Sequence, residues 1–131
     1  MNPVVHFEMP YDDRDRMSQF YAYAFGWQLQ TLGPEMGGYV TAATAEAGAD
    51  GRPLRPGAIN GGFFPRKPDW PAQVPSVVIA VDDILAALRQ VAAAGGSVLG
   101  EPVGIPGIGK YVSILDTEGN RVSLLQPLPR G

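Results

Sequence analysis

The chain has 131 residues, about the size of one domain and enough for one hydrophobic core. With 45% hydrophobic and 18% charged residues, the composition is that of a globular protein and not of a disordered or membrane-embedded chain. A net charge of −3, scattered basic residues and the absence of cysteine argue against a nucleic-acid partner, a disulfide framework and thiolate catalysis.

The N-terminus carries no basic segment followed by an apolar run, and no stretch approaches about 18 consecutive apolar residues. We therefore expect a cytoplasmic protein that neither spans a membrane nor carries an export signal.

Residues 4–9 alternate apolar and polar side chains, which is the period-2 pattern of a half-buried strand. Apolar residues then recur at helical spacing over 13–25, with Asp12 or Asp13 as the N-cap and Gly26 as the stop signal. The rest of the first half is predicted to contain two short strands, a long polar loop and a closing strand, over residues 27–32, 37–43, 45–57 and 58–65 respectively.

The same order of elements restarts in the second half of the chain. Moving the first half forward by 70 residues aligns the pair Asp12-Asp13 with Asp82-Asp83, and Gly26 with Gly96. The predicted elements are a strand, a helix and three further strands, over residues 76–83, 84–94, 97–103, 110–116 and 121–127. We therefore predict an α+β domain over 1–131, built from a βαβββ module at 1–68 and another at 74–131.

Two sets of motifs carry a resemblance to a known family. The first half contains H…D…R…FY…FGW, and the second contains VDD…AAL…AAGG…GEPV…Y…LDTEGN followed by RVSLLQP. Together they resemble the vicinal oxygen chelate superfamily, the group of glyoxalase I, the bleomycin resistance proteins and the extradiol dioxygenases. The resemblance implies two tandem βαβββ modules that form a curled mixed β-sheet cup, with the helices outside, the ligand inside and a homodimer as the assembly.

The resemblance also implies where a metal would be held. Metal-using members place one ligand on the first strand and one on the last strand of each half. His6 falls on the first of these positions, but Ser76 and Ser123 fall on two others, and residues 56–65 contain no Asp, Glu or His. One imidazole with neutral hydroxyls is a poor ligand set for a divalent metal, even if Glu8 adds a carboxylate. We expect no bound metal and no other cofactor.

His6 is the single histidine of the chain, and the alternation of its strand places it with Glu8 on the face opposite Phe7. One interpretation is a histidine that only satisfies a structural hydrogen bond. The other makes His6 and Glu8 the candidate catalytic residues on the polar floor of the cup. The candidate ligand-binding walls are Asn60, Ser76, Tyr111 and Ser123.

Two functions remain open from the sequence. The first is metal-independent binding of a small organic ligand, as in the bleomycin resistance branch of the family. The alternative is an isomerase, lyase or dioxygenase of the same superfamily, in which His6 and Glu8 or an atypical metal site carry proton chemistry. In both cases the expected partner is a small organic molecule, with no nucleic acid and no membrane.

Two other features have structural interpretations that we prefer, and a third stays open. GIPGIGK at 104–110 has the spacing of a phosphate-binding loop, but Tyr111 replaces the Ser or Thr and a strand follows, so a turn is predicted. The acidic pairs that precede the two helices are interpreted as caps. The segment that joins the halves, with Arg66, Lys67 and Trp70, either covers the mouth of the cup or is a plain linker.

Overall fold

The computed structural model describes residues 1–129, and these divide into two compact units. We call His6–Pro75 the N-terminal unit. The C-terminal unit consists of Met1–Val5 and the residues from Ser76 onward. Within the C-terminal unit, the carbonyl of Pro3 accepts a hydrogen bond of 2.9 Å from the amide of Ala80, which joins the first residues of the chain to its second half.

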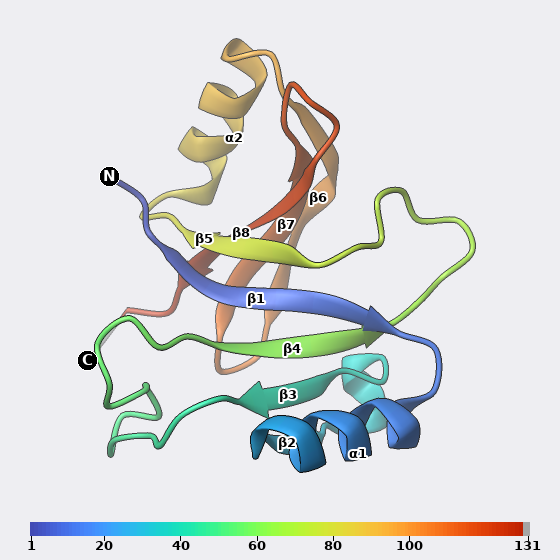
Figure 1. The fold of residues 1–131 in the computed structure, drawn as a ribbon. Coiled ribbons are helices and arrows are strands. Elements are labelled where there is room, and N and C mark those ends of the chain that lie inside the picture. Colours follow the sequence, from blue (N-terminus) through green and yellow to red (C-terminus); the bar gives the residue numbers. More distant parts are fainter. Residues whose placement is uncertain (130–131) are drawn as a thin grey trace. The chain divides into compact units, whose positions relative to one another are not determined.

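The N-terminal unit contains a mixed sheet with the strand order β2-β3-β4-β1 (Figure 1). Parallel pairing joins β1 to β4, whereas β2, β3 and β4 pair antiparallel. A short 3-10 turn at Pro34–Met36 lies between β2 and β3. The elements are β1 (Val4–Tyr11, of which the residues from His6 onward belong to this unit), α1 (Arg14–Phe25), β2 (Gln28–Thr31), β3 (Val40–Ala43) and β4 (Asn60–Pro65).

The C-terminal unit repeats this topology with the strand order β6-β7-β8-β5. Here β5 pairs parallel with β8, and β6, β7 and β8 pair antiparallel. The βαβββ order therefore occurs twice, and the predicted α+β class is confirmed. The elements are β5 (Ser76–Ala80), α2 (Ile84–Ala93), β6 (Ser97–Ile105), β7 (Gly109–Leu115) and β8 (Arg121–Pro127).

Both helices begin at an aspartate that caps them, as predicted. The Asp13 carboxylate accepts a hydrogen bond of 2.9 Å from the amide of Arg16, and the Asp83 carboxylate accepts one of 3.1 Å from the amide of Ala86. Gly26 ends α1 in the left-handed conformation, with a φ of 73°. These aspartates satisfy backbone donors that have no partner inside the helix.

Each unit has its own core between the sheet and the helix. In the N-terminal unit, Val40, Ala42 and Phe63 are buried, and Phe7, Met9, Met17 and Tyr21 pack against them. In the C-terminal unit, the buried residues are Val81, Ile84, Val112, Ile114 and Leu124. The alternation expected for β1 is therefore observed at Phe7 and Met9, although Val5 is exposed.

Two strands extend beyond their expected ends. The first strand was predicted over residues 4–9, but its parallel pairing with β4 continues through Pro10 to Tyr11. The strand predicted over residues 97–103 extends to Ile105 as β6. Its last two residues, Gly104 and Ile105, pair with Lys110 and Gly109 of β7. GIPGIGK therefore forms the tip of the β6–β7 hairpin, and no helix follows it, which confirms the predicted turn.

Among residues 1–129, neither helix combines the length and the apolar character that crossing a lipid bilayer requires.

Candidate functional site

The N-terminal unit carries a polar group of residues on the sheet face away from its core. His6 lies opposite Asn60, and Glu8 opposite Gly62, in the parallel pairing of β1 with β4. Directly paired residues point to the same face, and Phe7 and Met9 point into the core on the other face. His6, Glu8 and Asn60 therefore share one face, as the sequence predicts.

His6 is held by a tyrosine that lies just before β3. Its Nε2 is 2.9 Å from the hydroxyl oxygen of Tyr39. A neutral imidazole either donates through this nitrogen or accepts the tyrosine proton, depending on its tautomer. The ring of His6 is thus fixed by a side chain 33 residues further along the chain.

The close approach of Tyr39 depends on glycine at position 62. A Cβ atom built on Gly62 would collide with the hydroxyl and ring of Tyr39, and one built on Gly61 would collide with the ring of Phe7. The two glycines thus allow an aromatic ring on each face of β4. Glycine inside a strand often marks such a close approach.

Burial lowers the pKa of the His6 imidazole below its ordinary value of 6.5. Desolvation disfavours the charged form, and so His6 is neutral at neutral pH. Within residues 1–129, the Tyr39 hydroxyl is the hydrogen-bond partner of its ring, through Nε2. Its Nδ1 is therefore available to a ligand, as an acceptor in one tautomer and as a donor in the other.

Asn60 has one end of its amide engaged. Its side-chain oxygen accepts a hydrogen bond of 3.0 Å from the amide of Thr44, and the Thr44 hydroxyl donates to the carbonyl of Ile59 at 2.6 Å. These bonds fix the orientation of the amide, with its nitrogen left as a donor on the face that it shares with His6. Glu8 is 5% exposed on the same face.

The corresponding face of the C-terminal unit carries a cluster of hydroxyl groups. The Ser123 oxygen is 2.7 Å from the hydroxyl oxygen of Tyr111 and 3.1 Å from that of Ser113. The Nε of Arg121 donates to the Ser113 hydroxyl at 3.4 Å. Ser123 is fully buried, and Ser113 and Arg121 are each 5% exposed. This cluster is a buried polar network within one sheet.

Ser76, the remaining candidate, is the first residue of β5. It lies two residues before Val78, which pairs with Ser123, so it shares the face of the hydroxyl cluster. The predicted residues therefore form two groups, with His6, Glu8 and Asn60 in the N-terminal unit and Ser76, Tyr111 and Ser123 in the C-terminal unit.

Sequence reasoning missed the partner of His6 and two members of the hydroxyl cluster. The sequence-based predictions assign no role to Tyr39, although the glycine pair at 61–62 indicates that a side chain packs closely over β4. Ser113 and Arg121 went unnoticed. The alternation of β8, which places Arg121 on the same face as Ser123, could have identified the arginine.

The donor atoms on these faces do not fit a resident divalent metal. Within residues 1–129, no group of three or more His, Asp or Glu side chains is placed to hold a metal ion. Serine hydroxyls occupy the C-terminal face, and such neutral oxygens are weak ligands. The side chains on these faces offer hydrogen bonding and, at His6, proton transfer.

The sequence matches the family described as the Glyoxalase/Bleomycin resistance protein/Dioxygenase superfamily over residues 4–124. Curated relatives include the putative glyoxylase CFP32 of Mycobacterium bovis and that of Mycobacterium tuberculosis, each 37% identical over 89 residues. The alignment covers 68% of this chain but 29% of each relative, so the chain matches under a third of the length of these proteins.

Several solved structures are similar in fold. The hypothetical protein BH1468 from Bacillus halodurans C-125 has a TM-score of 0.69 at 14% identity, over 99% of this chain and 97% of that one. Methylmalonyl-CoA epimerase from Mycobacterium tuberculosis has a TM-score of 0.67 at 16% identity, over 96% and 88%. The Streptomyces coelicolor epimerase has a TM-score of 0.67 at 19% identity, over 96% and 97%. At these identities the similarity concerns the fold alone.

Proposed function

The chain belongs to the Glyoxalase/Bleomycin resistance protein/Dioxygenase superfamily, and from this premise we propose that it binds a small organic ligand, without a metal, on the polar face of its N-terminal unit. This membership was predicted from the sequence motifs and is confirmed by the family match. The ligand, the role of each residue and the absence of a metal are parts of the proposal.

The observation that carries the proposal is the hydrogen bond between His6 and Tyr39 on the sheet face away from the core. Burial keeps His6 neutral, and its second ring nitrogen is available to a ligand. Asn60, opposite His6 in the pairing, contributes an amide donor. Such a face is complementary to a ligand with a carbonyl oxygen beside a hydroxyl group. The amide of Asn60 donates a hydrogen bond, and Nδ1 of His6 donates or accepts one according to the tautomer of the ring.

Binding assays on two variants test this proposal. A thermal-shift screen of small carbonyl and hydroxyl compounds, with methylmalonyl-CoA among them, identifies a ligand. We expect His6→Ala and Tyr39→Phe to weaken its binding by about 1 kcal/mol, roughly fivefold, for the hydrogen bond lost or misoriented. The matched control is Tyr23→Phe, because Tyr23 is 96% exposed. Unchanged affinity in both test variants, with a lower melting temperature, would assign the pair to structure alone.

The metal-free part of the proposal has its own measurement. Protein purified without chelator is expected to contain less than about one tenth of an equivalent of nickel, zinc, iron or manganese, because His6 and Glu8 alone do not complete a coordination shell. A stoichiometric metal that is lost in His6→Ala would overturn it.

The alternative is an enzyme that moves a proton, and the neutral state of His6 favours it. A neutral imidazole is the form that acts as a general base, and several proteins of this fold are methylmalonyl-CoA epimerases. Incubation with methylmalonyl-CoA in deuterated water distinguishes binding from catalysis. Deuterium at the carbon between the two carbonyl groups, absent with His6→Ala, would support the enzyme. Tight binding with no exchange would support the binding protein.

The assembly and location also remain proposals. We propose a homodimer, because the sheet of each unit ends at an edge strand, β2 or β6, that a partner can cover. A monomer in sedimentation at micromolar concentration would contradict it.

We further propose that modules 1–68 and 74–131 form one domain, which a single unfolding transition would support. We also propose that the protein is cytoplasmic, which cell fractionation tests.

A further inference from the structure

The N-terminal unit has a cavity on the core side of its sheet, which is the side opposite the His6 face. Its volume is about 500 Å³, within the range of about 300–1,000 Å³ that is usual for small-molecule sites. Met9 and Phe63 from the sheet, and Met17, Phe20 and Tyr21 from α1, give it a largely apolar interior. Thioether and aromatic groups of this kind adapt to flat or branched apolar ligands.

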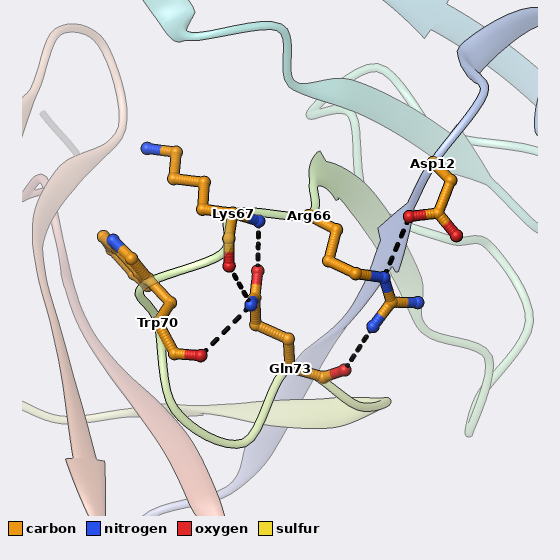
Figure 2. Close-up of polar contacts among 5 residues, drawn as sticks. All are labelled: Asp12, Arg66, Lys67, Trp70 and Gln73. Atoms are coloured by element: carbon orange, nitrogen blue, oxygen red, sulfur yellow. Dashed lines mark hydrogen bonds and ion pairs between the residues drawn. The ribbon is translucent and has the colours of Figure 1, made fainter.

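Four charged side chains lie at the rim, and two of them neutralise each other. The Nε of Arg66 is 3.0 Å from a carboxylate oxygen of Asp12, and its Nη1 donates to the carbonyl of Gln73 at 3.0 Å (Figure 2). A third, Asp13, caps α1 and so offsets the positive end of the helix dipole. Both rim carboxylates therefore already have partners.

Arg16 is the fourth charged group at the rim. Among residues 1–129, its guanidinium group makes no ion pair or hydrogen bond, and its backbone amide is bound by Asp13. It lies one helical turn before Phe20, so the two side chains are neighbours on α1. The rim thus carries two arginines and two aspartates, and the guanidinium of Arg16 is the one among them with neither an ion pair nor a hydrogen bond within residues 1–129.

The segment that follows β4 contributes Arg66 and Pro75 to the lining of the cavity. The Gln73 side chain accepts a hydrogen bond of 2.6 Å from the amide of Lys67 and donates to the carbonyls of Lys67 and Trp70 (Figure 2). These bonds close the segment on itself, and the Arg66–Asp12 ion pair ties it to the end of β1. The segment that carries Arg66 and Pro75 is therefore held by its own hydrogen bonds and by this ion pair.

From the cavity and its rim we propose a second binding site in the N-terminal unit, for a small organic acid with an apolar body and a single carboxylate. The apolar body packs on Met9, Met17 and the aromatic rings, and the carboxylate pairs with the guanidinium of Arg16. The planar guanidinium matches a carboxylate with two parallel hydrogen bonds. This site is separate from the His6 face and does not depend on the function proposed for it.

The methionines of the chain make the site directly observable. Of the four methionines, Met9 and Met17 line the cavity, whereas Met1 and Met36 do not. In a titration of the whole chain labelled with ¹³C at the methionine methyl groups, 2-naphthoate is expected to shift the signals of Met9 and Met17 and to leave those of Met1 and Met36 in place. Equal shifts of all four methionine signals would overturn the proposal. The absence of any shift at millimolar naphthoate would overturn it as well.

Two substitutions on one helical turn test the charge. Arg16→Gln is expected to weaken naphthoate binding about tenfold. The matched control, Arg14→Gln, removes the same charge from an exposed side chain that does not line the cavity, and is expected to change affinity less than twofold. Equal losses in the two variants would contradict a specific role of Arg16.

Two further comparisons distinguish this site from a cation-binding site and from binding on the His6 face. The cation 2-naphthylmethylammonium is expected to bind at least fivefold more weakly than naphthoate, and tighter binding of the cation would replace the proposal with a cation site formed by the aromatic rings and aspartates. His6→Ala is expected to leave naphthoate affinity within twofold. A larger loss would place naphthoate on the His6 face and overturn the assignment.

Discussion

The two units share one topology but use their helices and their sheet faces differently. In the C-terminal unit, α2 buries Ile84 in the core, whereas no residue of α1 is buried and Phe20, Tyr23 and Phe25 are exposed. On the other face, the C-terminal sheet carries a network of hydroxyl groups around Ser123, while the N-terminal sheet carries a histidine with an available nitrogen. The repeated βαβββ order therefore fixes the backbone but leaves the chemistry of each copy to individual residues.

This difference predicts that the helices contribute unequally to stability. Ile84→Ala is expected to lower the free energy of unfolding by about 2–5 kcal/mol, because it leaves a cavity in a packed core. Phe20→Ala is the control on α1, and is expected to cost less than about 1 kcal/mol because its ring is 57% exposed. Denaturant unfolding measures both. Equal costs would remove the distinction between the two helices.

The second expected effect concerns the glycine that lets Tyr39 reach His6. Gly62→Ala is expected to destabilise the protein by about 1–3 kcal/mol, because the new methyl group collides with the ring of Tyr39. The control is Gly104→Ala on β6, where a Cβ meets nothing within 4 Å. Thermal and denaturant unfolding compare them. A neutral Gly62→Ala would mean that Tyr39 is not packed over β4 as described.

A third prediction tests whether the hydroxyl network is structural. Ser123→Ala is expected to cost about 1–2 kcal/mol of stability, because it leaves the buried hydroxyl of Ser113 and the part-buried hydroxyl of Tyr111 with one hydrogen bond fewer. Tyr39→Phe is expected to cost less, because its partner His6 is only partly buried. If the order of the two costs is reversed, the His6–Tyr39 pair is the more structural of the two polar groups.

The smallest expected effect is the pH dependence that His6 contributes. Its pKa is lowered by burial in the folded protein, so below pH 6.5 the unfolded chain binds the proton more readily than the folded chain does. The stability contributed by neutral His6 is therefore present above pH 6.5 and is lost as the pH falls from 6.5 toward the folded pKa. His6→Gln is expected to flatten this part of the stability profile.

Because the chain has a single histidine, its pKa can be measured directly by proton NMR. A value below 6.5 is expected in the wild type and also in Tyr39→Phe, since desolvation is the cause of the shift. A value at or above 6.5 in the wild type would contradict the burial of His6. A return to 6.5 only in Tyr39→Phe would assign the shift to the tyrosine instead.

The sequence by itself determined the order of the elements, the caps and the face on which His6 and Glu8 lie. These features depend on local rules: alternation over 4–9 sets the faces of β1, and Asp13 and Asp83 bind amides three residues away. The repeat could also be recognised, because in each copy aspartates precede the helix and a glycine follows it at the same spacing.

Only the tertiary structure decided which side chains meet. Tyr39 reaches His6 across 33 residues because β3 and β4 pair in a particular register and Gly62 leaves room for the ring. Likewise, Arg121 and Ser113 join Ser123 through the register of β7 and β8. A pairing register is set by packing along both strands at once, and moving it by one residue would turn each of these side chains to the opposite face.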